Sequence, residues 1–334
     1  MNPLLERIET LQQSTGRARA RDLAAALGVT EMEIVAARGG VALRPRWTEP
    51  LAALPSLGRV MALTRNETAV HERRGTYAPA EGEGPVRLVL GPDIDLRLFL
   101  ARWCTAWAVV ENERRSVQIF DAHGEAVHKV YVSEPDGVPE WASLRDALRA
   151  DEEPPAPTAR PTPKPAIADD AVDVEGLHAA WRAMTDTHEF VMLLRNFNVT
   201  RTQALRLAPP EMVCALPPCT LAAALERAAA AELPIMIFVG NPGCIQIHTG
   251  PVRRLVPTPG SLNVLDPDFN LHVRLDRLAA CCRVRKPTAD GIVTSLEVFD
   301  VDGTLAVQLF GARKPGQPQP PAWEALVDGL GSAC

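Results

Sequence analysis

The chain has 334 residues, 46% of them hydrophobic, so it can bury one large core or two ordinary ones. Its formal net charge of −6 argues against a protein that binds nucleic acid or an anionic membrane, because both reward clustered positive charge. There is no secretory signal pattern and no apolar run of about 18 residues, and seven cysteines fit reduced thiols, so we expect a cytoplasmic protein without a membrane span.

The first patterned segment, Arg21 to Arg38, predicts two helices joined by a glycine-containing turn. This order resembles a DNA-reading helix-turn-helix, so a DNA-binding regulator is one alternative. The second helix carries Glu31 and Glu33, which have the wrong sign to face phosphates. We therefore favour a packed helical pair and expect no nucleic-acid partner.

Later segments alternate in hydrophobicity or are β-branched, and they predict antiparallel hairpins. Residues 116–120 and 126–131 flank a turn that contains Gly124, and a similar turn lies between Val298 and Thr304. Helical patterns precede the strands without strand–helix alternation, which favours an α+β fold. The proline-rich segment 151–170 predicts an extended linker between an N-terminal half, residues 1–150, and a C-terminal half, residues 171–334.

The two halves resemble one another in three collinear blocks, which indicates an internal duplication. Blocks that begin at residues 27, 95 and 116 match blocks that begin at residues 197, 270 and 295, as LGVTEMEIVAAR matches FNVTRTQALRLA. The prediction is two tandem, similar halves, each a large antiparallel β-sheet with helices packed at one face.

The common catalytic signatures GxSxG, Walker A, HExxH and GxGxxG are absent. Longer motifs instead resemble the cytoplasmic haem-utilisation, or hemin-degrading, proteins of the HemS/HmuS/ChuS kind, and this resemblance covers nearly the whole chain. The motifs are TRNETAVHERRGTY from Thr64, DLRLFLARW from Asp95, WRAMTDTHEF from Trp181, RTQALRL from Arg201, FVGNPGCIQIHTG from Phe238, RKPTADGIVTSLEVFD from Arg285 and QLFGAR from Gln308.

The resemblance implies that haem b is bound in the C-terminal half, between a helical layer and the face of a sheet, with His188 as the iron ligand. A neutral imidazole is a good axial ligand, and Phe190, Met192 and Leu193 would line an apolar slot beside it. The haem carboxylates need basic partners in a partly desolvated site. The resemblance places the further haem contacts at Arg201, Lys286, Gln308, Phe310 and Arg313, with Arg97 reaching in from the N-terminal half as a distal residue.

The internal duplication predicts one principal haem site per chain, because the N-terminal counterparts of these residues do not match. Under the block offsets, Arg201 falls on Glu31, Lys286 on Glu111, Gln308 on Lys129 and Phe310 on Tyr131. In the N-terminal half, His71 is a candidate for a second haem or an entry site, although an ordinary strand or turn histidine is the more common role.

Two positions depart from the family pattern. Phe310 stands in LFGAR where the family usually has LYGQR, so a hydroxyl that could order water or a haem carboxylate is lost. Pro242 stands in GNPGC where a basic residue is common, which lowers the expected charge of the pocket.

Two functions remain open. The protein could carry haem after uptake and hand it to a haem oxygenase or exchange it with an importer component, or it could open the porphyrin itself. The sequence has no flavin or nicotinamide motif, so an enzyme would need electrons from a separate reductase, which favours the carrier. An unperturbed imidazole titrates near about 6.5, so we expect haem affinity to fall in acid.

Overall fold

The computed structural model of the protein describes residues 2–16, 18–162, 165–314 and 316–332. Its fold is α+β, with two compact units that each take a short turn from the other part of the sequence. The first unit comprises the chain up to Asn66, Val70–Pro161 and Gly240–Gln246. The second comprises Glu67–Ala69, Thr162–Val239 and the chain from Ile247 onward.

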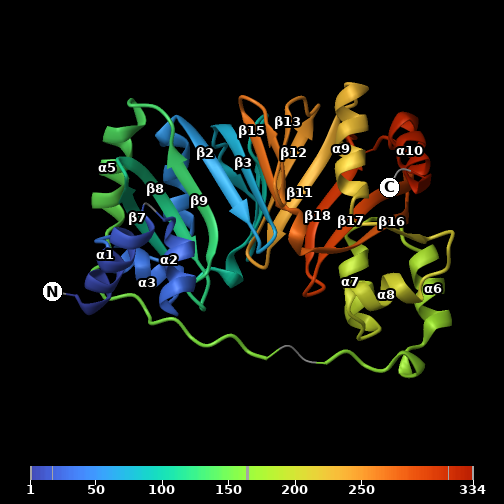
Figure 1. Ribbon diagram of the computed structural model, residues 1–334, viewed down its shortest axis with the longest axis horizontal. Helices are drawn as coiled ribbons and strands as arrows, with labels where there is room; N and C mark the ends of the chain where they lie inside the picture. The colour runs from blue at the N-terminus through green and yellow to red at the C-terminus, as the bar shows by residue number, and fades with distance from the viewer. Residues whose placement is uncertain (1, 17, 163–164, 315, 333–334) are drawn as a thin grey trace. The chain divides into compact units, whose positions relative to one another are not determined.

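The first unit contains helices α1 to α5 and strands β1 to β9 (Figure 1). Six neighbouring strands follow the order β1-β7-β8-β9-β2-β3, and β4, β5 and β6 form an antiparallel meander. The bounds are α1 Pro3–Thr15, α2 Ala20–Leu27, α3 Glu31–Ala37, α4 Thr48–Ala53, α5 Gly137–Leu148, β1 Val41–Leu43, β2 Arg59–Arg65, β3 Ala69–Thr76, β4 Ala80–Glu81, β5 Val86–Leu90, β6 Asp95–Phe99, β7 Thr105–Glu111, β8 Arg114–Phe120 and β9 Ala126–Val132.

The predicted hairpin of the first unit is confirmed. Strands β8 and β9 pair antiparallel with Ser116 opposite Tyr131. Gly124 in their turn has a φ of 74°, and a Cβ there would lie 2.6 Å from the Thr30 side chain, so both the backbone conformation and the close approach require glycine. Thr30 and Glu33 form a capping box that begins α3 beside this turn.

The helical pair predicted at 21–38 appears as α2 and α3, and α3 is packed on two sides. Its Ile34 joins Leu23 of α2 in a small helical core, while Met32 and Val35 pack with Trp107 on the sheet. This packing supports the helical-pair interpretation over a DNA-reading helix. The opposite face of the sheet is covered by α5, through side chains such as Trp141, Leu144 and Leu148.

The second unit contains helices α6 to α10 and strands β10 to β18. Neighbouring strands follow the order β10-β16-β17-β18-β11-β12, and β13, β14 and β15 form an antiparallel meander. The bounds are α6 Val174–Arg182, α7 Glu189–Asn196, α8 Arg201–Leu207, α9 Thr220–Ala230, α10 Pro321–Asp328, β10 Val213–Leu216, β11 Ile235–Asn241, β12 Cys244–Gly250, β13 Leu255–Thr258, β14 Ser261–Leu265, β15 Phe269–Arg274, β16 Leu278–Thr288, β17 Gly291–Asp300 and β18 Leu305–Gly311.

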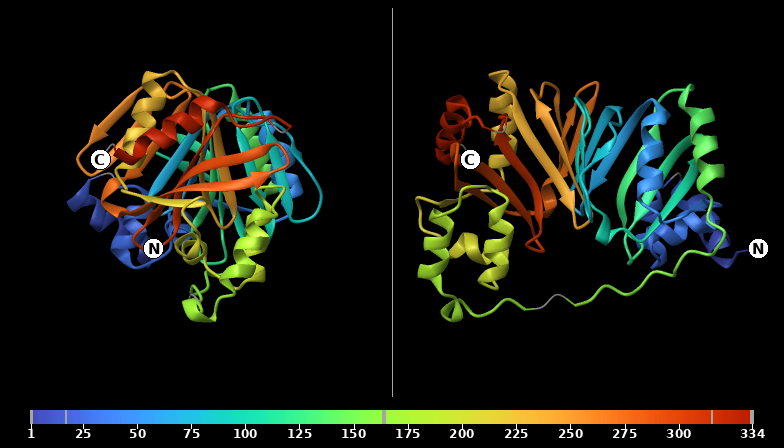
Figure 2. Two further views of the ribbon diagram at one scale, coloured as in Figure 1. Left: turned by 90° about the vertical axis from the view of Figure 1, so that its right-hand side faces the viewer. Right: turned by 180° about the vertical axis from the view of Figure 1, so that it is seen from behind.

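Helices also lie on both faces of the second unit's sheet. Helices α9 and α10 pack on the side chains of Leu296, Val298 and Leu309. Helices α6, α7 and α8 form a separate group that packs against Val284 and Phe299 (Figures 1 and 2). The predicted α+β class with two similar antiparallel units is confirmed, and the structure adds helices on the second face of each sheet.

The proline-rich segment has no helix or strand from residue 153 to residue 168 in its described part. Thr158 donates its backbone N–H to the carbonyl of Ala122 at 2.8 Å, and its own carbonyl lies 3.0 Å from Nδ1 of His123. These contacts attach the middle of the segment to the β8–β9 turn of the first unit.

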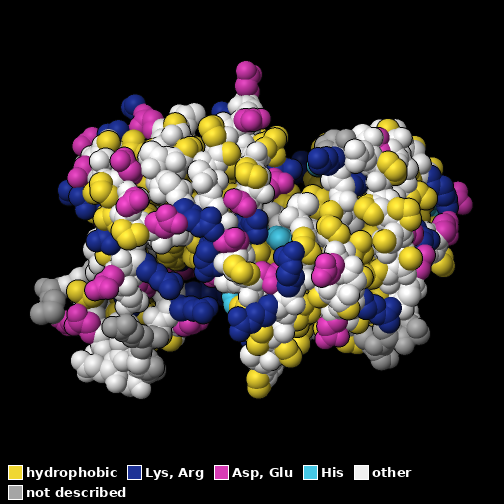
Figure 3. Space-filling model, turned by 90° about the horizontal axis from the view of Figure 1, so that it is seen from above, with side chains coloured by type: hydrophobic (Ala, Val, Ile, Leu, Met, Phe, Trp, Pro, Cys, Tyr) yellow, Lys and Arg dark blue, Asp and Glu magenta, His cyan; other side chains and the backbone are white. Residues whose placement is uncertain are grey.

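Within the described residues, no helix is long and apolar enough to cross a bilayer, and no group of His, Cys, Asp and Glu side chains is arranged to hold a bare metal ion. On the face in Figure 3, acidic side chains lie among the basic ones. Cys219 is disulfide-bonded, so the expectation of wholly reduced cysteines is wrong there, whereas free thiols remain at Cys104, Cys214, Cys244, Cys281 and Cys282.

Candidate functional site

Lys286, Gln308 and Phe310 point to one face of the second unit's sheet. Strand β17 pairs antiparallel with both β16 and β18. Glu297 lies opposite Gln308, and Lys286 lies opposite Val293, which is on the same side of β17 as Glu297 because successive residues alternate. Phe310 lies two residues beyond Gln308 on β18 and has the same orientation. The strand register therefore brings these residues together around Glu297.

The carboxylate of Glu297 is the centre of a buried polar cluster. Arg201 donates from Nε and Nη2 to its two oxygens at 2.7 and 2.8 Å, which is the bidentate geometry of a strong ion pair. Lys286 Nζ lies 2.5 Å from Oε1, and Gln308 Nε2 donates to the same oxygen at 3.1 Å. Glu297 is 0% exposed and Lys286 3%, whereas the Arg201 side chain is 23% exposed. Only Arg201 thus offers part of its charge to solvent.

The ionisation of this cluster follows from burial and from its own charges. Burial alone would raise the pKa of Glu297, but Arg201 and Lys286 outweigh it and hold that pKa well below its usual value. Burial lowers the pKa of Lys286 to about 8, even though the attraction of Glu297 opposes this change. At neutral pH the cluster therefore holds two cations and one anion.

The helical layer holds the cations from the other side. Arg201 is the first residue of α8, whose N-cap Thr200 accepts a hydrogen bond from the backbone of Gln203. The Phe190 ring of α7 lies 5.1 Å from Arg201 Cζ and 4.6 Å from Lys286 Nζ, within cation–π range. Trp181 of α6 packs edge-on against Phe190 at 4.6 Å between ring centroids. Helices α6 and α7 thus place the Phe190 ring against both cations, and α8 supplies Arg201.

His188 is the N-cap of α7, and its side chain is 88% exposed. Its Nδ1 lies 2.6 Å from Oδ1 of Asp186, and the same oxygen accepts the backbone N–H of His188 at 2.7 Å. That backbone hydrogen bond is the main cause of the lowered pKa of Asp186. The imidazole is therefore held through Nδ1.

The apolar neighbours of His188 differ from the expected set. Phe190 and Leu193 are buried in the helical core, so they do not line an open slot. Val191 and Met192 are instead exposed, at 47% and 52%. They follow His188 by three and four residues, so they lie on the same side of α7. This apolar surface extends from His188 along the first turn of the helix.

The two remaining predicted contacts of this unit lie near the end of β18. The rings of Phe310 and Phe238 have centroids 4.9 Å apart and are tilted. Arg313 Nη1 lies 3.5 Å from Oδ2 of Asp290, and its charge also helps to lower the pKa of Asp186. Arg313 is therefore close enough to act electrostatically on the turn that carries His188.

Arg97 and His71 belong to the first unit. Arg97 lies on β6 and forms an ion pair with Asp95. Burial raises the pKa of Asp95 although Arg97 opposes this change. His71 is fully buried on β3. The assignments of Arg97 as a distal residue and of His71 as a secondary site stay predictions.

The first unit has a polar cluster at the positions that the duplication relates to this site. Glu31, the counterpart of Arg201, begins α3 and forms ion pairs with Arg65 and, at 2.5 Å, with Lys129. Lys129 is the counterpart of the uncharged Gln308, so in this cluster the helix carries the anion and the sheet carries the cations. The Arg65 and Lys129 side chains are only 9% and 8% exposed. No cation of this cluster is offered to solvent as Arg201 is.

Sequence reasoning missed two carboxylates of the site. Glu297 lies in the SLEVF motif, and its place opposite Gln308 would have followed from the hairpin register once Asp302 and Gly303 were taken as the turn. Asp186 lies in the DTHEF motif, two residues before His188, a spacing that allows an aspartate to accept a hydrogen bond from the histidine backbone. Both carboxylates could therefore have been predicted from the neighbouring sequence.

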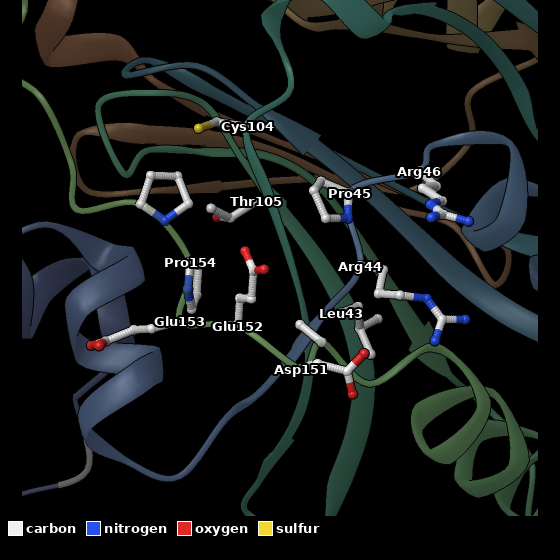
Figure 4. A pocket seen from close by; sticks show the side chains of 12 residues that line it. Leu43, Arg44, Pro45, Arg46, Cys104, Thr105, Asp151, Glu152, Glu153 and Pro154 are labelled. Atoms are coloured by element: carbon white, nitrogen blue, oxygen red, sulfur yellow. The ribbon is translucent and has the colours of Figure 1, made fainter.

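A separate cavity of about 390 Å³ lies in the first unit, between the end of β1, the start of β7 and the beginning of the proline-rich segment (Figure 4). Its wall includes Arg44, Cys104, Thr105 and Glu152. Arg44 is paired with Glu49 at 3.3 Å. The cavity shares no residue with the cluster around Glu297.

Comparisons with known proteins find similar proteins over nearly the whole length of the chain. A family model described as the haemin-degrading HemS.ChuX domain matches residues 28–148 and 198–330. The hemin transport protein HemS of Yersinia enterocolitica is 40% identical over 312 residues, or 91% of this chain and 90% of the relative. The structure of holo-PhuS, a heme-binding protein from Pseudomonas aeruginosa, is 47% identical with a TM-score of 0.95 over 97% of both chains. That of ChuS, described as an E. coli heme oxygenase, is 37% identical with a TM-score of 0.89 over 99% of both chains. The chain therefore belongs to the haemin-degrading HemS.ChuX family.

Proposed function

We propose that this protein binds haem b in its second unit and carries it through the cytoplasm after haem uptake, delivering it for iron release. The observation that carries this proposal is the exposed imidazole of His188, held at Nδ1 by Asp186. It stands two residues before Phe190, whose ring contacts the cations Arg201 and Lys286. An imidazole ligand and paired cations in the same unit are the groups that an iron porphyrin with two carboxylates needs.

The residues present fit haem on chemical grounds. His188 keeps Nε2 for the iron, because its Nδ1 is engaged. Val191 and Met192 offer apolar surface next to this ligand, and Phe310 offers an aromatic ring on the sheet face. Arg201 is partly exposed and is the cation best placed to meet a haem carboxylate. When bound, the haem would supply the iron, and these residues would orient it and neutralise its charge.

The relatives support carriage. HemS is described as a hemin transport protein, and PhuS as a heme-binding protein. We propose that a haem oxygenase or an importer component exchanges haem with this chain. We expect no nucleic-acid partner because the formal net charge is −6.

A second function, haem degradation, is favoured by the similarity to ChuS, which is described as a heme oxygenase. In that alternative a separate reductase supplies electrons, and Arg97 acts as the distal residue. An enzyme needs an open coordination position on the iron, whereas a carrier can close it with a second ligand.

A haem titration followed by absorbance tests both proposals. The variants are His188→Ala and, as a control, His123→Ala, which removes a histidine of the first unit. Loss of tight binding in His188→Ala alone supports the ligand assignment. An unchanged Soret spectrum in His188→Ala would contradict it and direct attention to His71.

Adding ascorbate or a reductase under air then separates the two functions. A stable ferrous complex supports the carrier. Loss of the Soret band that persists with catalase supports enzymatic ring opening, whereas loss suppressed by catalase indicates coupled oxidation by stray peroxide.

A further inference from the structure

The turn before α7 holds His188 by a single carboxylate oxygen. Oδ1 of Asp186 lies 2.7 Å from the backbone nitrogen of His188 and 2.6 Å from its ring Nδ1. One oxygen thus fixes both the start of the helix and the direction of the imidazole. An ionised carboxylate only accepts hydrogen bonds, so the proton of a neutral His188 ring must lie on Nδ1 and the lone pair on Nε2.

The turn that carries this carboxylate is itself attached to the second unit. The backbone N–H of Glu189 donates to the carbonyl of Asp186 at 3.1 Å. The Glu189 side chain accepts from both the backbone and the hydroxyl of Thr185. The carbonyl of Thr185 accepts the N–H of Ala289, in the β16–β17 turn, at 2.8 Å. Asp186 is therefore placed by backbone and side-chain contacts, although its carboxylate is exposed.

We propose that Asp186 is a positioning residue for the iron ligand, which rests on the proposed function. It holds His188 in the Nδ1–H tautomer with Nε2 directed away from the turn. Its negative charge also makes the imidazole a stronger donor, since carboxylates behind ligating histidines raise ligand basicity. A stronger donor favours ferric over ferrous iron, so Asp186 sets which oxidation state the protein holds more tightly.

Two substitutions separate the two roles of the carboxylate. Asp186→Asn keeps an acceptor for Nδ1–H but removes the charge, whereas Asp186→Ala removes both. The matched control is Asp173→Ala, because Asp173 caps the neighbouring helix α6 through Gly176 at 2.9 Å without contacting a histidine. A general effect of losing a helix cap would appear in the control as well.

The first measurement needs no haem. Long-range ¹H–¹⁵N NMR of the His188 ring reports which nitrogen carries the proton. We expect the Nδ1–H form in wild type, in Asp186→Asn and in the control, and loss of its predominance in Asp186→Ala. The second measurement is the affinity for ferric and ferrous haem, together with the reduction potential. We expect Asp186→Ala to weaken ferric binding about tenfold with little change in ferrous binding. That ratio corresponds to a rise in potential of about 59 mV for one electron.

The outcomes distinguish this proposal from the one on which it rests. If His188→Ala abolishes tight binding but Asp186→Ala keeps the tautomer and the ferric-to-ferrous affinity ratio of wild type, Asp186 is only a helix cap and this proposal alone is overturned. If His188→Ala leaves the Soret spectrum unchanged, His188 is no ligand and both proposals fall. A tautomer change with a raised potential, absent from Asp173→Ala, supports the positioning role.

Discussion

Replacing Glu297 by glutamine should destabilise the second unit, because it removes the anion that pairs with both the buried Lys286 and the partly exposed Arg201. Arg201 loses a bidentate charged contact, and hydrogen bonds to charged groups contribute about 1.5–3 kcal/mol. Lys286 can escape the repulsion by losing its proton. With its pKa already lowered to about 8, this costs roughly 1.4 kcal/mol at pH 7. Together these terms give about 3–4 kcal/mol, within the range that breaking a buried pair costs.

Urea unfolding at pH 7 measures the lost free energy of unfolding. Because two units need not unfold together, hydrogen exchange in β16–β18 assigns the loss to the second unit. The matched control is Glu211→Gln, which breaks the exposed pair with Arg182 and should change the stability little. The double variant Glu297→Gln with Lys286→Met also removes one of the two cations left without an anion, so it should recover part of the lost stability. A Glu297→Gln variant no less stable than Glu211→Gln would refute the reasoning.

Three other outcomes can be measured directly. Because the pKa of Glu31 falls from 4.5 to about 2 on folding, up to roughly 3 kcal/mol of stability is present above pH 4.5 and lost as the pH falls toward 2. Glu31→Gln should therefore flatten acid unfolding in that window, and an unchanged curve would contradict this. Haem titration should end at one equivalent per chain, and a second tight equivalent would contradict the single site. Phe310→Tyr should keep haem affinity within about twofold, since the ring remains, while changing the rate of Soret loss under reductant.

The hairpins could be predicted because their signals are local. The alternation of residues 116–120 and 126–131 and the glycine between them lie within one short stretch of sequence, and the register of β8 and β9 follows. The same reasoning applied to β17 and β18 would have placed Glu297 opposite Gln308. The contact of Arg201 with Glu297 spans 96 residues and depends on how α8 packs on the sheet, which no local pattern shows.

The solvent-facing side of α7 could also have been predicted from the sequence. Helical spacing relates Phe190 to Leu193 and relates His188 to Val191 and Met192, so the buried and exposed sides can be separated once the helix start is known. The expectation that Phe190 lines an open slot treated all apolar neighbours alike. No local pattern predicted that Glu67–Ala69 belongs to the second compact unit and Gly240–Gln246 to the first. The division into compact units depends on long-range packing, which a short stretch of sequence does not show.

The two clusters show how one duplicated framework can differ in what it offers a ligand. The positive end of the helix dipole lies at the N-terminus, so it disfavours a cation there and favours an anion. Arg201 at the start of α8 therefore needs a compensating negative charge, whereas Glu31 at the start of α3 is favourably placed. Glu297 provides that compensation while leaving 23% of the Arg201 side chain exposed. In the first unit the anion is on the helix, and both cations are buried beneath it. The sign of one helix residue thus decides whether the positive charge of the cluster is enclosed or partly exposed, and this difference is the reason that we expect the dianionic ligand in the second unit.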